Sequence, residues 1–414
     1  MTFELLPYTY NRWIANDPNG QTSPQTWSDN LRHGWGWDND HFPVNQLAHP
    51  YSGNLYFNSA RANGYDFWSS SPFALAGSVL WEYFGEAQRP SINDLINTTF
   101  GGITLGETLF RLSNLILDRH TTGVTRVVRE IGAAIVNPPL ALTRLMDGDI
   151  GRVEPNPVNR VPSRLASEFN LGYQRVSQGS AESPLTTPNQ LFLFYSLDYG
   201  DPLRGDVTHP FGAFRLDATA ATSTTGVISE LHALGYLSTH EFSHLEDHHQ
   251  QVQLALNYDY LNNQAILTGG QGLSGIFITR HPVARSVSLR TEVSAIGYVI
   301  DGVKSDFSPT TADSSTARNY DYGMGGGGRV VARMERHGDV LLEAGYQNTW
   351  IGVLSGAARD IRYDVLSARL EVPIVGELAL GGSALLYHRT SRYATHETVH
   401  ARDAITQVFA AVLF

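Results

Sequence analysis

The most constraining feature of this chain is an alternation of apolar and polar residues that runs from about Ser163 to the end. Between Val287 and Val299, every second residue is mostly apolar and the residues between them are mostly polar. We count about twelve such segments of about ten residues or more, the length that a tilted membrane-spanning strand requires. Alternation places one set of side chains on lipid and the other in a polar lumen. The pattern therefore predicts an antiparallel membrane β-barrel of about twelve strands over residues 161–414. The expected strand centres are Asn170, Tyr195, Leu216, Ala233, Leu256, Gly272, Val293, Gly328, Ala344, Ala368, Ala384 and Val408.

The apolar segment Val408–Phe414, which ends on an aromatic residue, indicates where such a barrel resides. A frayed terminal edge strand is sticky, and a barrel that closes on this strand removes the edge. A terminal Phe after alternating apolar residues resembles the signal that bacterial outer-membrane barrels carry for their insertion machinery. We therefore expect the outer membrane, with the insertion machinery and outer-membrane lipid or lipopolysaccharide as partners.

The connections between the segments also suit a membrane barrel. We expect long polar loops around Ser183, Thr311 and Gly356, and tight turns at His337-Gly338 and Val375-Gly376. Long loops on one side and short turns on the other are usual in these barrels. A water-soluble β-sandwich or lipocalin-like barrel is the alternative, but its strands are usually shorter.

The composition supports a location in the cell envelope and excludes several classes of function. Charged residues make up only 17% of the 414 residues, and cysteine is absent. The absence of cysteine excludes disulfides and thiolate chemistry and suits an oxidising compartment. A formal net charge of -11 argues against a nucleic-acid partner, because nucleic acid is itself negatively charged. Because no secretion signal precedes Thr2, we expect the chain to be the mature form.

The polar residues of the strands should fill the lumen. Both signs of charge occur among them, and mixed charges in a narrow barrel form salt bridges across it, which argues against a wide pore. We therefore expect an interior that is either plugged by the barrel itself or occupied by the N-terminal domain. The residues expected to point inward are Arg215, Asp217, Arg290, Glu292, Glu343, Arg369 and Glu371.

Residues 1–160 have a different pattern, which predicts a mainly helical domain, periplasmic or inside the barrel. The first 48 residues are rich in Asn, Asp, Pro, Gly and Trp and are expected to form ordered loop. Ser91, with Asp94 three residues later, is an acidic form of capping box. Glu107 and Arg111 are spaced to form an i,i+4 ion pair. The expected helical segments are 54–62, 67–85, a helix from Pro90-Ser91, 100–117 and 124–146, the last interrupted at Pro138-Pro139.

The densest set of motifs lies in this domain. It includes His49-Pro50-Tyr51-Ser52-Gly53, then Trp81-Glu82-Tyr83-Phe84-Gly85-Glu86, then Pro90-Ser91-Ile92-Asn93-Asp94-Leu95. These blocks resemble a family of bacterial envelope proteins that is defined only as a domain of unknown function. The resemblance covers about 80 residues and implies an envelope protein of Gram-negative type with a C-terminal barrel. It implies no established activity.

Glu82 and Glu86 are the most informative residues of these motifs. They lie four residues apart among apolar neighbours, and adjacent buried carboxylates need a proton, a cation or basic partners. One interpretation is a metal or acid/base site, with His49, Glu82, Glu86 and Asp94 as candidate catalytic residues. The other is a structural network in which Asp94 caps its helix, Glu107 pairs with Arg111, and Arg61 neutralises Glu82 or Glu86. The sequence identifies no cofactor and no particular metal.

Two further patterns suggest metal ligands. His240-Glu241-Phe242-Ser243-His244 matches the zinc-protease motif His-Glu-x-x-His, but that motif requires a helix, and here it lies between strand patterns. A solvated turn, or a turn that binds metal adventitiously, fits this context better. Asp38-Asn39-Asp40 offers oxygen ligands for calcium, although the Gly and the terminal Glu of an EF-hand loop are missing.

Two functional hypotheses follow from the sequence. In the first, the helical domain caps or plugs the barrel, and the protein handles an envelope lipid or a small solute. In the second, the protein is a hydrolase that modifies lipid or lipopolysaccharide at the His49 and Glu82 site. Barrels of about twelve strands can be lipid hydrolases, but that is an analogy of architecture alone.

Overall fold

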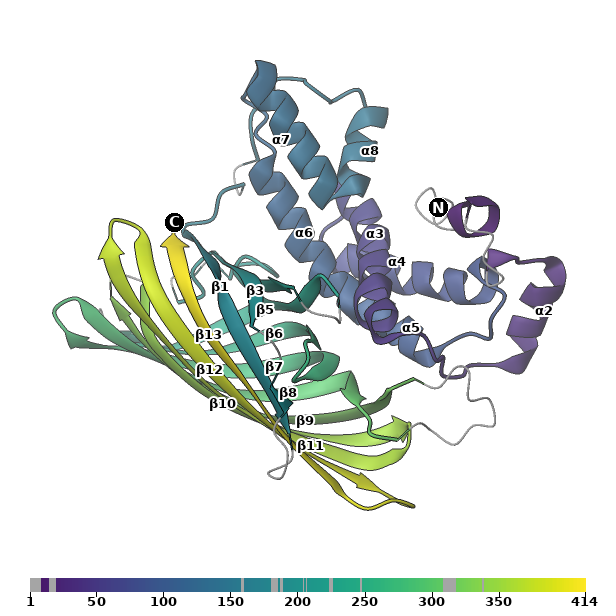
Figure 1. Ribbon diagram of the computed structural model, residues 1–414. Helices are drawn as coiled ribbons and strands as arrows, with labels where there is room; N and C mark the ends of the chain where they lie inside the picture. The colour runs from purple at the N-terminus through teal and green to yellow at the C-terminus, as the bar shows by residue number, and fades with distance from the viewer. Residues whose placement is uncertain are drawn as a thin grey trace. The chain divides into compact units, whose positions relative to one another are not determined.

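The chain forms two compact units, 1–161 and 162–414, each with its own set of internal contacts. In a computed structural model, the described residues are 9–14, 20–157, 160–179, 185–186, 189–203, 205, 207–222, 226–245, 248–307, 318–336 and 339–414. The first unit is helical and the second is a single sheet (Figure 1).

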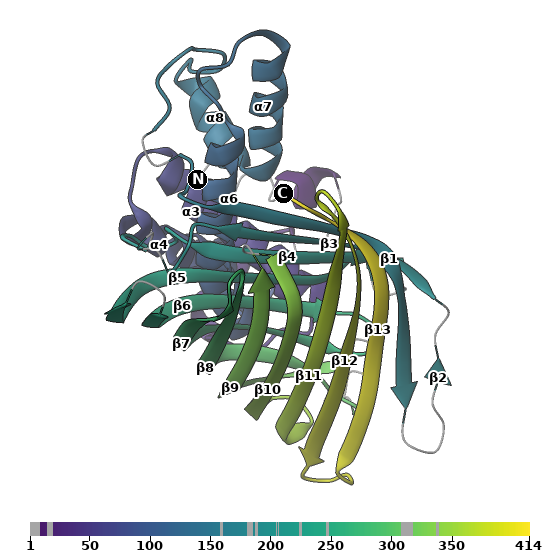
Figure 2. The same cartoon turned by 90° about the vertical axis from the view of Figure 1, so that its left-hand side faces the viewer.

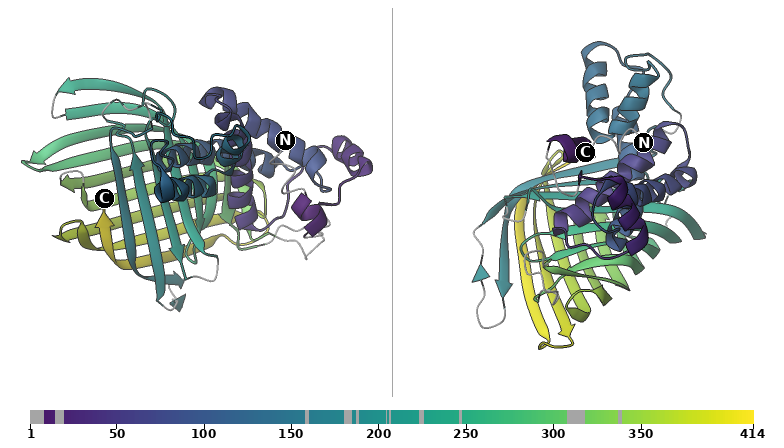
Figure 3. Two further views of the ribbon diagram at one scale, coloured as in Figure 1. Left: turned by 90° about the horizontal axis from the view of Figure 1, so that it is seen from above. Right: turned by 90° about the vertical axis from the view of Figure 1, so that its right-hand side faces the viewer.

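The second unit is a closed antiparallel β-barrel, as the alternation predicts. Each strand pairs with its neighbours in sequence, and the last strand, β13 (Val399–Leu413), pairs with the first, β1 (Leu165–Gly179). This final ladder runs from Glu168 opposite Leu413 to Gly179 opposite Arg402. Figures 2 and 3 show β13 beside β1 along one continuous curved sheet.

Twelve strands form the ring, and a two-residue strand, β2 (Leu185–Thr186), adds to the end of β1. All twelve expected strand centres lie within strands, so the predicted fold class is confirmed. The other strands are β3 (Gln190–Tyr199), β4 (Phe214–Ala221), β5 (Ile228–Leu245), β6 (His248–Asn262), β7 (Leu267–Ala284), β8 (Val287–Lys304), β9 (Tyr320–Arg336), β10 (Asp339–Ser355), β11 (Ala358–Val375) and β12 (Leu378–Tyr393).

The barrel is apolar outside and charged inside. Outward-facing aliphatic side chains such as Val293, Leu366 and Val408 are exposed on its wall. The residues between these outward-facing positions point inward and line a central cavity of about 340 Å³. Of the seven residues expected to point inward, six line this cavity, and the seventh, Glu371, pairs with one of the six, Arg369.

Arginines cross-link the inner wall. Arg333 on β9 binds Glu292 on β8 at 2.7 Å and also binds Glu343 on β10. Arg369 on β11 binds Glu168 on β1, which is three strands away around the ring, with β12 and β13 between them. These pairs are the salt bridges that mixed charges in a narrow lumen predict.

The barrel's own residues occupy its interior near both ends. Near one end, the segment after β3 folds inward, where Leu203 packs with Tyr236 and Ile276, and Gln251 donates to the Leu203 carbonyl at 3.3 Å. Near the other end, the β6–β7 loop reaches across to β3, and Gln190 donates to the Gln264 side chain at 3.0 Å. Residues of the barrel unit therefore narrow the interior near both ends.

Two local expectations for the barrel were wrong. The loop at Gly356 is short, because β10 ends at Ser355 and β11 begins at Ala358. His240 and Glu241 lie within β5 and not in the turn expected there. As the strand patterns on both sides indicated, the helix that a zinc-protease motif requires does not form at these residues. The loop positions Ser183 and Thr311 and the turn His337-Gly338 lie outside the described residues.

The first unit contains the predicted helices, and its described residues also form one α-helix and two π-helical turns within the first 48 residues, which the sequence did not predict. Ser23 caps α2 (Pro24–His33) by accepting from the Thr26 amide, within the stretch expected to be loop. Three long helices each contain a π-helical turn, denoted η. The remaining elements are η1 (Tyr10–Ile14), η3 (Val44–Ala48), α3 (His49–Ala62), α4 (Phe67–Leu80), η4 (Trp81–Gly85), α5 (Ile92–Ile96), η5 (Asn97–Gly101), α6 (Gly102–Ile116), α7 (Gly123–Val136) and α8 (Pro138–Met146).

The helix pair α3 and α6 forms the centre of this unit. Gly53, the glycine of the His-Pro-Tyr-x-Gly motif, meets Gly102 at the crossing, and a Cβ on Gly53 would lie 1.8 Å from the Thr98 carbonyl oxygen. Only glycine permits backbones to approach this closely. No described helix is long and apolar enough to cross a membrane.

Candidate functional site

Three helices of the first unit deliver the predicted site residues. His49 begins α3 directly after η3, Glu82 lies in η4, and Asp94 lies in α5 directly before η5. Each residue is therefore in or beside a π-helical turn. Such turns are rare and occur frequently at functional sites.

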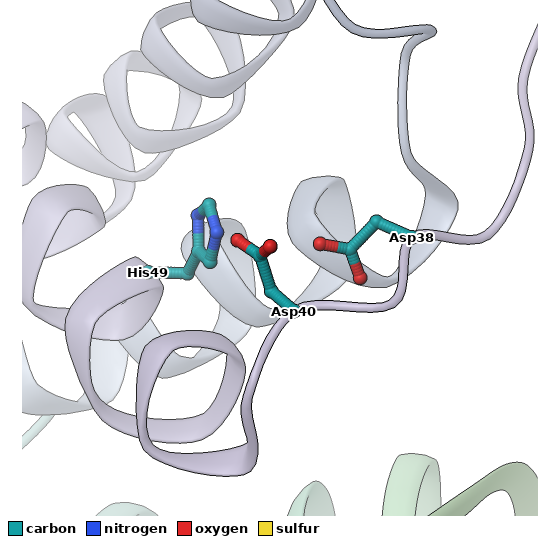
Figure 4. Close-up of side chains that lie close together, drawn as sticks. All are labelled: Asp38, Asp40 and His49. Atoms are coloured by element: carbon teal, nitrogen blue, oxygen red, sulfur yellow. The ribbon is translucent and has the colours of Figure 1, made fainter. Parts of the chain in front are cut away.

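The site brings together five carboxyl groups and one imidazole. One ligand atom from each of Glu82, Glu86 and Asp94 lies within 4.8 Å of those of the other two. The same is true of Asp38, Asp40 and His49, whose side chains converge in Figure 4. The His49 Nε2 atom lies 3.4 Å from Asp94 Oδ1 and so joins the two groups. We call these six residues the carboxylate cluster.

Side-chain amides hold the carboxylates in place. Asn93 donates from Nδ2 to Asp38 Oδ1 at 2.6 Å and to Asp94 Oδ1 at 2.8 Å. Asn45 donates to the same Asp38 oxygen at 2.8 Å. Asn30 donates to the main-chain carbonyls of Glu82 and Glu86 at 3.3 and 3.1 Å. The cluster is therefore positioned by neutral donors, which orient the carboxylates without cancelling their charge.

The predicted capping box is formed only in part. Ser91 caps α5 by accepting from the Asp94 amide at 3.4 Å. The reciprocal acceptor for the Ser91 amide, however, is Glu82 Oε2, at 2.6 Å, and not Asp94. The Asp94 carboxyl is therefore directed toward His49 and the cluster.

Burial and mutual repulsion dominate the electrostatics of the cluster. Glu82 is 1% exposed and Asp94 is 2% exposed. Burial, then the nearby Asp94, raises the pKa of Glu82 to about 9. Burial, then the charge of Glu82, raises the pKa of Glu86 to about 8. Burial and the neighbouring Asp38 also raise the pKa of Asp94 well above its usual range.

The expected basic partner of this cluster lies elsewhere. Arg61 binds Glu107 through two hydrogen bonds of 2.7 and 3.0 Å, and Arg111 binds the same carboxylate at 2.8 Å. The structural network therefore exists, but around Glu107. Among the described residues, no arginine or lysine forms an ion pair with Glu82, Glu86 or Asp94.

The structure thus brings together all four predicted site residues. It adds Asp38 and Asp40, which the sequence suggested only as a separate calcium loop. The sequence analysis missed the positioning residues Asn30, Asn45 and Asn93. For Asn93, its place between Ser91 and Asp94 in the third motif was the available signal.

Comparison with known proteins supports the resemblance inferred from the motifs. Residues 34–139 match the model of a family described as a domain of unknown function (DUF3943). All six residues of the carboxylate cluster lie in the matched segment. No curated protein matches the chain.

The solved structures that match include a porin, a transporter and an outer membrane channel. The NanC porin is 5% identical over 59% of this chain and 99% of its own, with a TM-score of 0.28. The toluene transporter TodX of Pseudomonas putida is 7% identical over 62% of this chain and 90% of its own, with a TM-score of 0.25. The outer membrane channel DcaP of Acinetobacter baumannii is 8% identical over 61% of this chain and 96% of its own, with a TM-score of 0.24.

Proposed function

We propose that this protein resides in the bacterial outer membrane and that its helical unit is a metal-dependent hydrolase acting on an envelope lipid or lipopolysaccharide. The barrel supports the location, because a closed ring of strands with aliphatic side chains outside and ion pairs inside suits lipid around it. The interior is occupied by the barrel's own residues, so a plug from the helical unit is not needed to narrow it.

The observation that carries the hydrolase proposal is the convergence of five carboxyl groups and one imidazole at which no arginine or lysine of the described residues pairs with Glu82, Glu86 or Asp94. Such a set needs either bound protons or a bound cation. Carboxylate oxygens suit Mg²⁺, Ca²⁺ and Mn²⁺ and are also ligands of Zn²⁺. The raised pKa values of Glu82 and Glu86 describe the site without an ion, and a divalent cation would displace those protons.

A cation held here would supply the chemistry of ester hydrolysis. It would polarise an ester carbonyl or phosphoryl oxygen and lower the pKa of a bound water. His49 is the one imidazole of the cluster and is half-buried, so we assign it as the group that exchanges a proton with that water. Glu82 and Asp94, being the most buried, are assigned as ligands.

The test uses full-length protein in detergent, with titration of Mn²⁺, Zn²⁺, Mg²⁺ and Ca²⁺ by calorimetry. We expect saturable binding of Mn²⁺ or Zn²⁺ and a loss of at least tenfold in affinity for Glu82→Gln. Asp147→Asn, which removes an exposed carboxylate outside the cluster, is the matched control and should bind normally. The absence of binding for all four ions would refute the metal site.

A second assay tests the reaction. Purified protein loaded with Mn²⁺ or Zn²⁺ is incubated with lipopolysaccharide, and the mass of lipid A is followed beside His49→Ala and Glu82→Gln. We expect a mass loss that both variants abolish and Asp147→Asn retains. If the protein binds metal but the mass of lipid A does not change, the cluster is a cation site and the hydrolase proposal is refuted.

The barrel cavity favours a second candidate function, the handling of a small solute. The cavity of about 340 Å³ has charges of both signs, including Arg215, Asp217 and Glu292, and tyrosines on its wall. This wall suits a small polar molecule that carries both charges. Uptake of labelled amino acids into liposomes that contain the protein would support this candidate, and permeability no greater than that of empty liposomes would remove it.

A further inference from the structure

The helical hairpin α7–α8 exposes an apolar stripe. On α7 the side chains of Val124, Val127, Val128, Ile131 and Ile135 are each between 56% and 79% exposed. Their spacing of three, four and seven residues places them on one face of the helix. Leu145 and Met146, at the end of α8, are also exposed, at 62% and 76%. We call this set the α7–α8 stripe.

The charges of the same hairpin are turned inward. Arg126 is 3% exposed and binds Glu130 at 2.8 Å. Arg144 on α8 is 5% exposed and binds the same carboxylate at 3.1 Å. Arg126 also donates to the main-chain carbonyl of Asp118 at 2.8 Å. The hairpin therefore has charges within and aliphatic side chains outside.

This arrangement is the reverse of that of a helix in contact with water. A water-exposed helix places its charged residues outside, and a contiguous apolar patch marks an interaction site. The barrel wall likewise has charges inside and aliphatic residues outside. This shared arrangement indicates that the stripe and the outer wall face the same solvent. A lipid surface therefore fits the stripe better than a polar protein partner does.

The chain connection limits how far the start of the first barrel strand can lie from the segment tied to α6. Arg160 donates to the Leu115 carbonyl at 2.8 Å, which ties the connecting segment to α6. β1 begins at Leu165, so only residues 161–164 lie between this contact and the barrel strand. Four extended residues span about 14 Å at most. A lipid surface that surrounds the start of β1 is therefore within reach of the helical unit.

We propose that the α7–α8 stripe inserts into the interfacial layer of the membrane in which the barrel resides. The hairpin lies in the interface and does not cross it, because α7 has 14 residues and α8 has 9, and about 20 are needed to span. The inference rests on the membrane location proposed above and is independent of the hydrolase. It would hold the carboxylate cluster's unit at the lipid surface.

The cysteine-free chain offers a direct test. Val127→Cys and Ile131→Cys are labelled separately with an environment-sensitive fluorophore in full-length protein in phospholipid vesicles. Nitroxide-labelled lipids then quench whatever lies in the bilayer. Val293→Cys, on the outer barrel wall, is the positive control, and Gln25→Cys, exposed on α2, is the aqueous control.

We expect more than twofold quenching at positions 127, 131 and 293, with headgroup-labelled lipid most effective at 127 and 131, and little quenching at position 25. Quenching at 293 with none at 127 and 131 would overturn the stripe's insertion and leave the barrel's location intact. A stripe that is shielded from water but not quenched would show that it packs on protein, which also overturns the inference. No quenching at 293 would refute the membrane location itself.

Discussion

Two buried glutamates of the helical unit, Glu107 and Glu82, show how differently one unit can treat a carboxylate. Glu107 is 0% exposed and lies between Arg61 and Arg111, which compensate its charge. Glu82 is 1% exposed, accepts from the Ser91 amide, and has Asp94 and Glu86 as neighbours. Burial alone therefore does not define a structural residue. The sign of the neighbouring charges separates a site that is complete from one that needs protons or a cation.

The largest effect that can test this comparison is the loss of the Glu107 charge. Glu107→Gln leaves Arg61 and Arg111 without their buried counter-charge and should lower the free energy of unfolding by about 3–5 kcal/mol. Urea unfolding followed by tryptophan fluorescence reports mainly on this unit, since only Trp350 of the 7 tryptophans lies in the barrel. A loss below about 1 kcal/mol would show that water already compensates these arginines.

The next effect is the dependence of stability on pH in the presence of a chelator. In the folded state the pKa of Glu82 is about 9 and that of Glu86 about 8, against 4.5 for the unfolded chain. The folded state therefore holds more protons than the unfolded state between about pH 5 and pH 9, and its stability must fall as pH rises through this window. We expect a continuous loss of stability across this window, measured by helical circular dichroism during urea unfolding.

Added Mn²⁺ or Zn²⁺ should remove most of this loss, because the cation replaces the protons. A metal-free stability that stays level or rises between pH 5 and pH 9 would contradict the repulsion among these carboxyl groups.

A smaller effect is expected from the positioning amide. Asn93→Ala removes the donor shared by Asp38 and Asp94 and should lower the affinity for the bound cation by about 10- to 100-fold. Asn63→Ala, which loses only an exposed bond to the Ser59 carbonyl, is the matched control. Calorimetric titration measures both, and equal affinity in the two variants would exclude a positioning role for Asn93.

The smallest effect has the opposite sign from the first. Glu82→Gln keeps an acceptor for the Ser91 amide and removes a carboxyl group that is costly to ionise. In metal-free protein at pH 9 it should raise the free energy of unfolding by about 1 kcal/mol, and at pH 5 it should change nothing. A destabilisation as large as that of Glu107→Gln would show that the two glutamates are equivalent after all.

The barrel was largely predictable because its signal is local. Alternation with period two is visible in each strand separately, and neighbouring strands pair in sequence order, so residues such as Arg290 and Glu292 were placed inward from sequence alone. The exceptions depend on longer-range structure. The short turn at Gly356 and the inward course of Leu203 follow from how the ring closes, and α2 was missed because Ser23-Pro24 stands in a stretch of loop-forming residues.

In the carboxylate cluster, the sequence by itself determined the cap at Ser91 and the short separation of Glu82 and Glu86, because these depend on residues within a few positions of one another. Glu86 lies in extended backbone directly after η4, so the two glutamates do not share a helix face. Only the tertiary structure decided that Asp38 and Asp40 join them and that Arg61 compensates Glu107 instead of Glu82. The close crossing of α3 and α6 at Gly53 and Gly102 brings Arg61 to Glu107, and the amides of Asn45 and Asn93 hold Asp38 near Asp94. The choice of a partner for a buried charge is made by packing, which spacing along the chain does not encode.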